Sequence, residues 1–333
     1  MITALLTMKN EFINDVFSET CLHDIAQTVD LRIAENITAG SNIEKWLKLY
    51  KPEILITGWG SPPLNEMIPD KCEQLRYVCH CGGTIKRIIP RDLVDKGLIV
   101  TNWGDFPSSM VAEAALTGIL SCLRKLPFVH EVMHHEHGWM RLAESRTETL
   151  FHKKVGIFGF GHSGQYLARL LKPFCCRVSA FSPFENQVVF EKYGVERIDS
   201  LKELFLDNQI ISIHAAASKE NVHIIDKKML SLLKDGSIVV NTARGNIVDE
   251  TALIDELVTG RLQASLDVYE TEPLPEDSPL RGLKNVQLIP HQASPTADQR
   301  HRIGELVLDN IRRYVHGDDV KNRITADMYD WMT

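Results

Sequence analysis

The sequence predicts an α/β protein with two doubly wound parallel sheets, and three observations support this fold class. Short apolar runs of strand length alternate with segments of helical length along most of the chain, which is the rhythm of a parallel sheet. The 333 residues exceed a single ordinary domain of roughly 100–200 residues. A glycine-rich turn at 159–164 lies between one apolar run and a helical segment.

The first series of predicted strands occupies the N-terminal third of the chain. Residues 54–57, 75–79 and 98–101 are short apolar runs bounded by Gly, Pro or polar residues, and 90–96 has the length of a connecting helix. Residues 1–8 are apolar and are expected to form the first strand rather than a signal peptide, because no positively charged region precedes them.

A second series of predicted strands begins near Lys154. Its members are residues 155–158, 178–181, 210–213, 238–240, 264–266 and 286–289. A helical stretch at 109–125 is expected to lead from the first domain to the second, and a helix at 297–314 to lead back. We therefore predict one domain at 104–295 and another at 1–103, completed by 296–333.

Composition and charge exclude several classes of protein. With 44% apolar and 24% charged residues, the chain is globular rather than disordered. Its net charge of −7 argues against nucleic acid or an anionic membrane as a partner. No apolar run approaches the roughly 20 residues that span a bilayer, so we expect a cytoplasmic protein. The seven cysteines, an odd number, are expected to be buried free thiols.

The glycine-rich turn has the pattern G-x-G-x-x-G, formed by Gly159, Gly161 and Gly164. It follows a predicted strand and opens a predicted helix, which is the context that dinucleotide binding requires. The first glycine allows the tight turn, the second lets a pyrophosphate approach the backbone, and the third lets helix and strand pack closely. The pyrophosphate is expected at the helix N-terminus, near His162 and Ser163.

The next predicted strand lacks the acidic residue that usually binds the ribose. Ser182 stands where an Asp or Glu would accept from the ribose 2′-hydroxyl, and Glu185 comes three residues too late. Without that acid a 2′-phosphate is not repelled, yet no Arg or Lys follows Ser182 to attract one. The sequence thus leaves the choice between NAD and NADP open.

Three further strand ends carry an Arg, a carboxylate and a His. Arg244 follows the strand 238–240, Asp267 and Glu272 follow 264–266, and His291 ends the last strand. Ligands of open α/β sheets bind at the carboxyl ends of the strands. We therefore expect these side chains to lie close together at one edge of the sheet.

This set fits the reduction of a 2-oxo acid. Arg is suited to hold a planar carboxylate by two parallel hydrogen bonds, so Arg244 can bind and polarise the substrate. His291 can donate the proton to the carbonyl oxygen and, when neutral, act as the base in the reverse direction. Glu272 can accept from the other imidazole nitrogen and favour the protonated ring.

The stretches GFGHSG (159–164), NTARGNIVDE (241–250), SLDVYETEPLP (265–275) and IPH (289–291) resemble, in order, the D-isomer-specific 2-hydroxyacid dehydrogenase family, which includes phosphoglycerate dehydrogenase and the glyoxylate/hydroxypyruvate reductases. The resemblance spans nearly the whole chain. It implies a Rossmann NAD(P)-binding domain and a flavodoxin-like substrate-binding domain with a cleft between them. It also implies a homodimer.

The resemblance assigns roles by position. It makes Arg244 the substrate-binding residue, and Glu272 and His291 the acid–base pair. Asp267, Thr242, Ala243 and His214 would lie near the nicotinamide. In the first domain, the loop Gly82-Gly83-Thr84 resembles the segment whose backbone N–H groups hold the substrate carboxylate.

Three departures from the family pattern keep other functions open, the first being Ser182 in place of the usual ribose-binding Asp. The chain has His214-Ala-Ala-Ala-Ser where the family has His-x-Pro-Leu-Thr, and Gln292-Ala after the catalytic His where a small residue and Gly are usual. The alternatives are a dinucleotide-sensing corepressor that binds partner proteins, or a homologue that has lost catalysis. The histidines at 130–137 have spacing that can hold a metal, but no fixed carboxylate or thiol completes a set, and we expect no metal.

Overall fold

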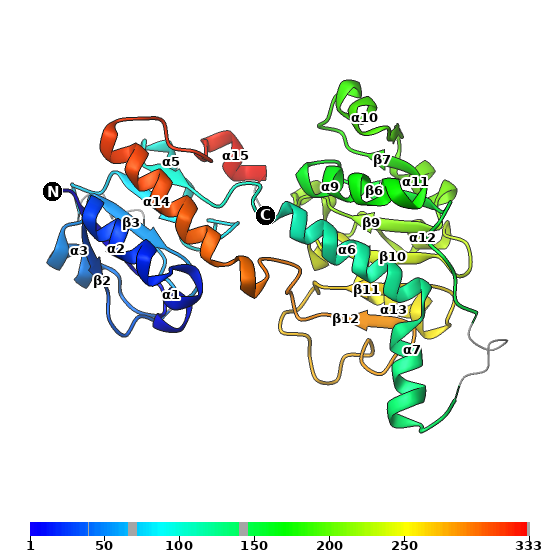
Figure 1. The fold of residues 1–333 in the computed structure, drawn as a ribbon. Helices are drawn as coiled ribbons and strands as arrows, with labels where there is room; N and C mark the ends of the chain where they lie inside the picture. Colours follow the sequence, from blue (N-terminus) through cyan, green and yellow to red (C-terminus); the bar gives the residue numbers. More distant parts are fainter. Residues whose placement is uncertain (39, 66–71, 140–145, 332–333) are drawn as a thin grey trace. The chain divides into compact units, whose positions relative to one another are not determined.

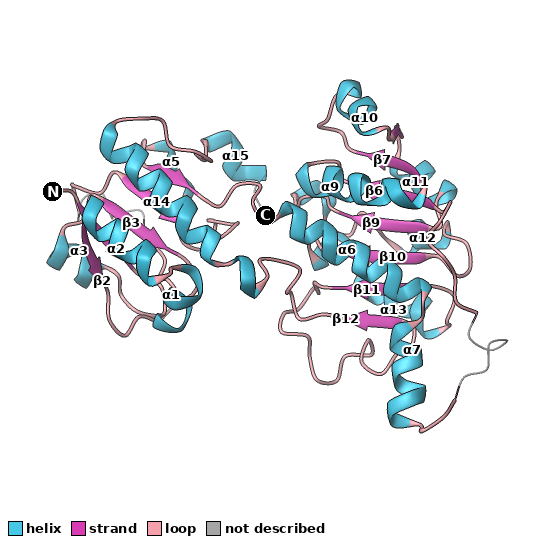
Figure 2. Cartoon of the chain, in the orientation of Figure 1, coloured by secondary structure: helices cyan, strands magenta, loops and turns pink. Residues whose placement is uncertain are grey.

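The computed structural model describes residues 1–333 except 39, 66–71, 140–145 and 332–333. It divides into two compact units, Met1–Phe106 with Thr296–Thr333, and Pro107–Pro295. Each unit contains one parallel sheet with helices on its faces, as Figure 2 shows. The predicted fold class, two doubly wound α/β domains, is confirmed.

The first unit has a five-stranded sheet in the order β2-β1-β3-β4-β5. This 2-1-3-4-5 order is that of flavodoxin-like folds. Its strands are β1 (Thr3–Leu6), β2 (Asp30–Ile33), β3 (Ile54–Thr57), β4 (Tyr77–His80) and β5 (Ile99–Thr101). Its helices are α1 (Asn10–Val16), α2 (Glu19–Thr28), α3 (Glu44–Tyr50), α5 (Arg91–Asp95), the 3₁₀ turn Ala297–Gln299, α14 (His301–His316) and α15 (Ala326–Trp331).

Alternation along the strands builds a core on each face of this sheet. Ala4 and Leu6 of β1 belong to one cluster, with α14, whereas Leu5 belongs to the other. Successive side chains of a strand point to opposite faces, so a strand that is apolar throughout is buried on both sides. Figure 1 shows α14 crossing this sheet, which places residues from the C-terminus in the N-terminal unit.

The second unit has a seven-stranded sheet in the order β12-β11-β10-β9-β6-β7-β8. Its strands are β6 (Lys154–Phe158), β7 (Arg177–Phe181), β8 (Glu196–Arg197), β9 (Ile210–Ile213), β10 (Ile238–Asn241), β11 (Gln263–Leu266) and β12 (Val286–Leu288). From β8 to β11 this is the 3-2-1-4-5-6 order of dinucleotide-binding folds, and β12 adds one strand at the edge.

Helices cover both faces of the seven-stranded sheet. They are α6 (Ser108–Leu123), α7 (Leu126–His130), the π-helix Glu131–His135, α9 (His162–Leu171), α10 (Gln187–Tyr193), α11 (Leu201–Asp207), α12 (Lys227–Ser231) and α13 (Glu250–Val258), with 3₁₀ turns at Lys172–Phe174, Lys219–Asn221 and Gly245–Ile247. In Figure 1, α6 lies across the strands. A Cβ on Gly118 of α6 would lie 2.5 Å from Ser265 Oγ, so this helix packs directly on β11.

Several sequence expectations need correction. The strands β2 and β8 were not predicted: β2 is an edge strand with two exposed residues, and both residues of β8 are exposed, so neither has an apolar run. The return helix 297–314 is a 3₁₀ turn followed by α14. All seven thiols are free, but Cys175 is exposed and Cys176 half-buried. No helix in the described part of the chain is long and apolar enough to cross a membrane.

Candidate active site

Polar and glycine residues follow the strands of the second unit at one edge of its sheet. All the strand pairs of this sheet are parallel, so the carboxyl ends of its strands share an edge. The residues that directly follow β6, β7, β9, β10 and β11 are Gly159, Ser182, His214, Thr242 and Asp267. His291 comes three residues after β12. The predicted residues of this unit are therefore positioned along one edge.

The glycine-rich turn has the shape that its sequence predicts. Gly159 has φ +89°, and a Cβ there would lie 2.5 Å from the backbone N of Ala215, so the turns after β6 and β9 touch. A Cβ on Gly164 would lie 2.5 Å from Gly159 O, which fixes the close approach of α9. A Cβ on Gly161 would meet nothing within 4 Å, so open space lies in front of this residue.

This open space faces the start of α9, where an anion can bind. Gly161 is the N-cap and its residue type offers no side chain to accept from the first N–H groups. Those groups have no partner within a helix, and the helix dipole favours negative charge there. His162 is exposed and Ser163 half-buried at the same terminus. The turn thus fits a dinucleotide pyrophosphate.

Two buried polar atoms near this edge have no hydrogen-bond partner among the described residues: His214 Nδ1 and Thr242 Oγ1. The other nitrogen of His214 lies 2.8 Å from Ser212 Oγ. Burial lowers the pKa of His214 to about 4, so its ring is neutral at physiological pH. An unsatisfied buried polar atom costs free energy, and a bound polar ligand can supply the missing partner. These atoms fit the carboxamide end of a nicotinamide cofactor.

Ser182 directly follows β7 and is 6% exposed. It occupies the position after the second Rossmann strand at which a ribose-binding acid stands in other dinucleotide-binding folds. A serine hydroxyl is neutral, so it neither repels nor attracts a 2′-phosphate by charge.

Arg244 is carried by a loop that is braced at both ends. The buried side chain of Asn241 accepts from Ala243 N at 3.0 Å and donates to the carbonyl of Arg244 at 2.9 Å. Arg244 Nη1 donates to Ala243 O at 2.6 Å. Asn241 therefore fixes the backbone from which the guanidinium projects, at the carboxyl end of β10.

His291 and Glu272 form a hydrogen-bonded pair. His291 Nδ1 lies 2.7 Å from Glu272 Oε2, and the other oxygen of Glu272 accepts from Tyr269 N at 3.1 Å. The side chain of His291 is 47% exposed and that of Glu272 is 35% exposed. A carboxylate at Nδ1 holds that nitrogen as the N–H, which leaves Nε2 for an external group. This is the geometry of a general acid–base with an orienting partner.

Asp267 is used in a way that sequence reasoning did not foresee. It is 1% exposed, and its two carboxylate oxygens accept from Gln292 N at 2.6 Å and Ala293 N at 3.0 Å. Burial raises the pKa of this carboxyl, although the two N–H groups stabilise its charge. Asp267 therefore holds the segment that follows His291.

The predicted loop of the first unit follows β4. A Cβ on Gly82 would lie 2.6 Å from His80 Nε2, and the carbonyl of Gly83 accepts from Asn102 Nδ2 at 2.7 Å. Thr84, the last predicted residue, is half-buried. His80 Nδ1 lies 2.8 Å from Thr57 Oγ1, and burial lowers the pKa of His80 to about 4. The neutral imidazole of His80 thus packs against this loop at Gly82.

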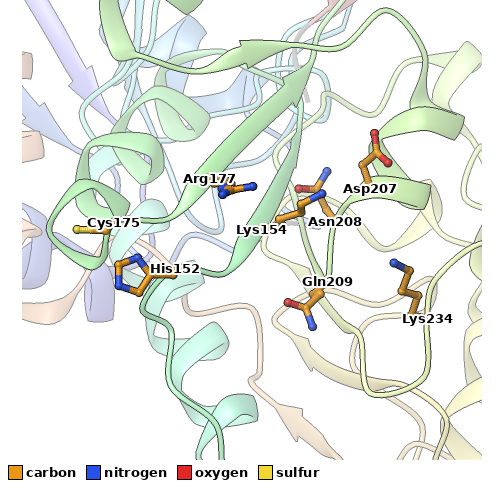
Figure 3. Close-up of a pocket in the computed structure, with 8 residues that line it drawn as sticks. All are labelled: His152, Lys154, Cys175, Arg177, Asp207, Asn208, Gln209 and Lys234. Carbon is orange, nitrogen blue, oxygen red and sulfur yellow. The ribbon is translucent and has the colours of Figure 1, made fainter.

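A cavity of about 500 Å³ lies at the other edge of the seven-stranded sheet. Figure 3 shows its lining, which includes Lys154 and Arg177, the first residues of β6 and β7. No residue predicted for the site lines it. Within the described ranges, no group of three or more His, Cys, Asp or Glu could hold a metal, and the histidines at 130–137 are no exception.

Sequence reasoning missed Asn241 and Tyr269 as residues that build the site. Asn241 is the last residue of β10 and the first of the stretch 241–250 that resembles the family. A polar side chain at the end of a strand can hydrogen-bond the backbone of the following loop, and this signal could have identified it. Tyr269 also lies in a matched stretch, but nothing in the sequence indicates where its hydroxyl points.

Comparison with known proteins supplies the family. Residues 116–293, more than half of the chain, match the family model described as "D-isomer specific 2-hydroxyacid dehydrogenase, NAD binding domain". The chain belongs to this family. The resemblance noted in the sequence is therefore confirmed.

Individual relatives agree with this membership. The chain is 29% identical over 311 residues to a D-3-phosphoglycerate dehydrogenase of Methanocaldococcus jannaschii, covering 93% of this chain and 58% of that one. It is 33% identical over 243 residues to a hydroxypyruvate reductase of Thermotoga maritima, covering 72% and 77%. The chain spans only about half the length of several curated relatives that it matches.

The fold has close counterparts among solved structures. The apo form of D-mandelate dehydrogenase from Rhodotorula graminis superposes with a TM-score of 0.84 at 21% identity, covering 97% of each chain. At this identity the likeness concerns the fold.

Proposed function

We propose that this protein is an NAD(P)-dependent D-2-hydroxyacid dehydrogenase that reduces a small 2-oxo acid. Family membership supports the reaction class. The observation that carries the proposal is the His291–Glu272 pair, 2.7 Å apart at the carboxyl edge of a dinucleotide-binding sheet. An acid–base histidine with an oriented tautomer is what proton transfer to a carbonyl oxygen requires.

Arg244 holds the substrate in this proposal. Its guanidinium can bind the carboxylate by two parallel hydrogen bonds and can also polarise the neighbouring carbonyl. The brace from Asn241 supports this role, because it holds the backbone that carries the Arg244 side chain. In the first unit, 1–103 with 296–333 is proposed as the substrate-binding domain, and the backbone N–H groups of Gly82, Gly83 and Thr84 bind the substrate carboxylate.

His291 moves the proton. Protonated His291 donates from Nε2 to the carbonyl oxygen as C2 is reduced, and the neutral ring keeps its Nδ1–H on Glu272. In the oxidation direction, neutral His291 takes the hydroxyl proton at Nε2. Glu272 remains a carboxylate throughout and stabilises the imidazolium.

The domain 104–295 holds the cofactor in this proposal. Gly159, Gly161, His162, Ser163 and Gly164 bind the pyrophosphate, Ser182 faces the ribose, and His214, Thr242, Ala243 and Asp267 surround the nicotinamide. NAD(P), when bound, supplies or accepts the hydride. Because Ser182 is neutral, we propose that the site accepts NAD and can also accept NADP.

The test is an assay of purified protein with NADH and NADPH against glyoxylate, hydroxypyruvate, pyruvate, 2-oxoglutarate and bulkier 2-oxo acids. We expect oxidation of at least one cofactor with at least one acid. His291→Ala should lower kcat with little change in cofactor affinity, and Arg244→Ala should mainly raise the KM for the acid. Lys228→Gln, on an exposed helix face, serves as the control. Cofactor binding without oxidation of any pair would contradict the enzyme and favour a dinucleotide sensor.

We also propose a cytoplasmic homodimer without nucleic acid as a partner. The free thiols are typical of a reducing compartment, and the net charge of −7 does not attract nucleic acid. Leu126 of α7 is 53% exposed and Trp139, after the π-helix, is 82% exposed, and large apolar side chains of this kind become buried when copies of a chain associate. Light scattering after gel filtration should give twice the chain mass of 37.7 kDa.

A further inference from the structure

The hydroxyl of Tyr269 sits between the ends of β11 and β12. It lies 3.0 Å from Leu266 O and 2.9 Å from Ile289 O, and it accepts from Ile289 N at 3.1 Å. A phenol has a single proton, so it donates to one of the two carbonyls at a time. Tyr269 is 7% exposed, so water is not freely available to replace it. Burial raises the pKa of Tyr269 to about 12, and its hydroxyl stays a neutral donor at working pH.

The strand end that this hydroxyl holds leads directly to His291. Ile289 N also donates to Leu266 O at 2.9 Å, and the next residue, Pro290, has no N–H to continue the ladder. His291 then adopts φ +51°, a left-handed conformation that is unfavourable for a residue with a Cβ. Such a conformation persists only where its surroundings fix it. His291 N donates to Asp267 O at 2.9 Å, and the Tyr269 hydroxyl holds the backbone of Ile289, two residues earlier.

The backbone of the same residue holds the partner of His291. Tyr269 N donates to Glu272 Oε1, and Glu272 Oε2 lies 2.7 Å from His291 Nδ1. Tyr269 therefore touches both sides of the pair, Glu272 through its N–H and the His291 segment through its hydroxyl. Simple core packing explains the buried ring, but it does not explain a hydroxyl with three backbone partners at this point.

We infer that Tyr269 is a positioning residue, whose hydroxyl sets the orientation of the His291 imidazole on Glu272. The expected effect on turnover rests on the proposed function. The expected effect on the orientation of the His291 imidazole does not. The hydroxyl does not act on the substrate: its partners are backbone atoms. Removal of the hydroxyl should leave cofactor binding intact and loosen the acid–base pair.

The test is Tyr269→Phe, which keeps the ring and removes the hydroxyl. The matched control is Tyr77→Phe, because Tyr77 is also buried and its hydroxyl bonds Thr101 Oγ1 at 2.7 Å in the other unit. We expect Tyr269→Phe to lower kcat about tenfold, with less than about a twofold change in cofactor KM. The pH profile of kcat should shift in Tyr269→Phe and not in Tyr77→Phe, since a general loss of stability would not move it. All assays are run below the onset of thermal unfolding of each variant.

A second measurement does not depend on activity. Protein labelled with ¹⁵N at histidine reports the ring tautomer, and the His291 signal is identified by its absence in His291→Gln. Tyr269→Phe should move the His291 ring signals toward tautomer averaging and leave those of His162 unchanged. If neither the wild-type protein nor Tyr269→Phe turns over any substrate but the His291 ring signals change, the proposed function is wrong and the positioning role stands. Unchanged ring signals together with wild-type kcat would overturn the inference.

Discussion

Gly245 and Tyr269 are in direct backbone contact: a Cβ at position 245 would lie 1.9 Å from the carbonyl carbon of Tyr269. Gly245 follows Arg244, and Tyr269 begins the turn that carries Glu272. Two further bonds join the same loops, because Glu250 N donates to Glu270 Oε1 and Glu270 N donates to Glu250 Oε2, both at 3.1 Å. These contacts therefore fix the separation of Arg244 from Glu272. The loops lie so close together that a side chain at position 245 would not fit between them.

We predict that Gly245→Ala destabilises the protein and lowers turnover. The atoms that its Cβ would meet belong to the backbone and cannot rotate away, so the loops must separate, at a cost of roughly 1–3 kcal/mol or more. Thermal denaturation and the reductase assay measure the two effects. A variant with the wild-type melting temperature would show that the loops are not held in contact.

Gly161→Ala should have the opposite pattern. Its Cβ would meet nothing within 4 Å, and its φ of −67° suits any residue, so stability should be unchanged. The added methyl would occupy the space through which a pyrophosphate approaches the helix N-terminus. We expect the Kd for NADH to rise about tenfold or more, which corresponds to about 1.4 kcal/mol, in a fluorescence titration. Equal affinity in the two proteins would place the pyrophosphate elsewhere.

Glu272→Gln should lower kcat by roughly 10²–10⁴, the range that general acid–base catalysis contributes. The amide can still accept from Tyr269 N, but its other end is an NH₂ group that cannot accept from His291 Nδ1. Glu276→Gln, an exposed change in the same loop, is the control. Steady-state kinetics on both variants decide the matter, and comparable activity in the two would remove Glu272 from the mechanism.

Stability should fall as the pH drops from about 6.5 to about 4. His80 and His214 each have a pKa near 4 in the folded chain because of burial, whereas an unfolded histidine titrates near 6.5. In this window the unfolded chain binds more protons, so the free energy of unfolding rises with pH and is lost on acidification. Each histidine contributes roughly 3 kcal/mol to the full change.

Urea denaturation at several pH values measures this effect. His80→Gln should reduce the pH dependence of the free energy of unfolding of the first unit. His301→Gln, a change at an exposed position, should leave that pH dependence unchanged. A free energy of unfolding that is constant between pH 6.5 and 4 would show that these rings are accessible to water.

The sequence predicted the element order because its strands are apolar on both faces. Runs such as 54–57 and 210–213 are buried throughout, and such runs stand out in a sequence. The exposed strands β2 and β8 carry no such signal. The strand ends could also be read, since Arg244, Asp267 and His291 follow apolar runs.

The sequence by itself determined the fold class, the glycine-rich turn and the family, because periodicity and residue type at strand ends are local properties. The tertiary structure alone decided two further sets of contacts: the two backbone amides on Asp267, and the hydroxyl of Tyr269 between two strands. These contacts join residues that are up to 26 positions apart, through backbone groups that every residue has. Composition and spacing carry no information about where such groups meet, because only the packed sheet brings them together.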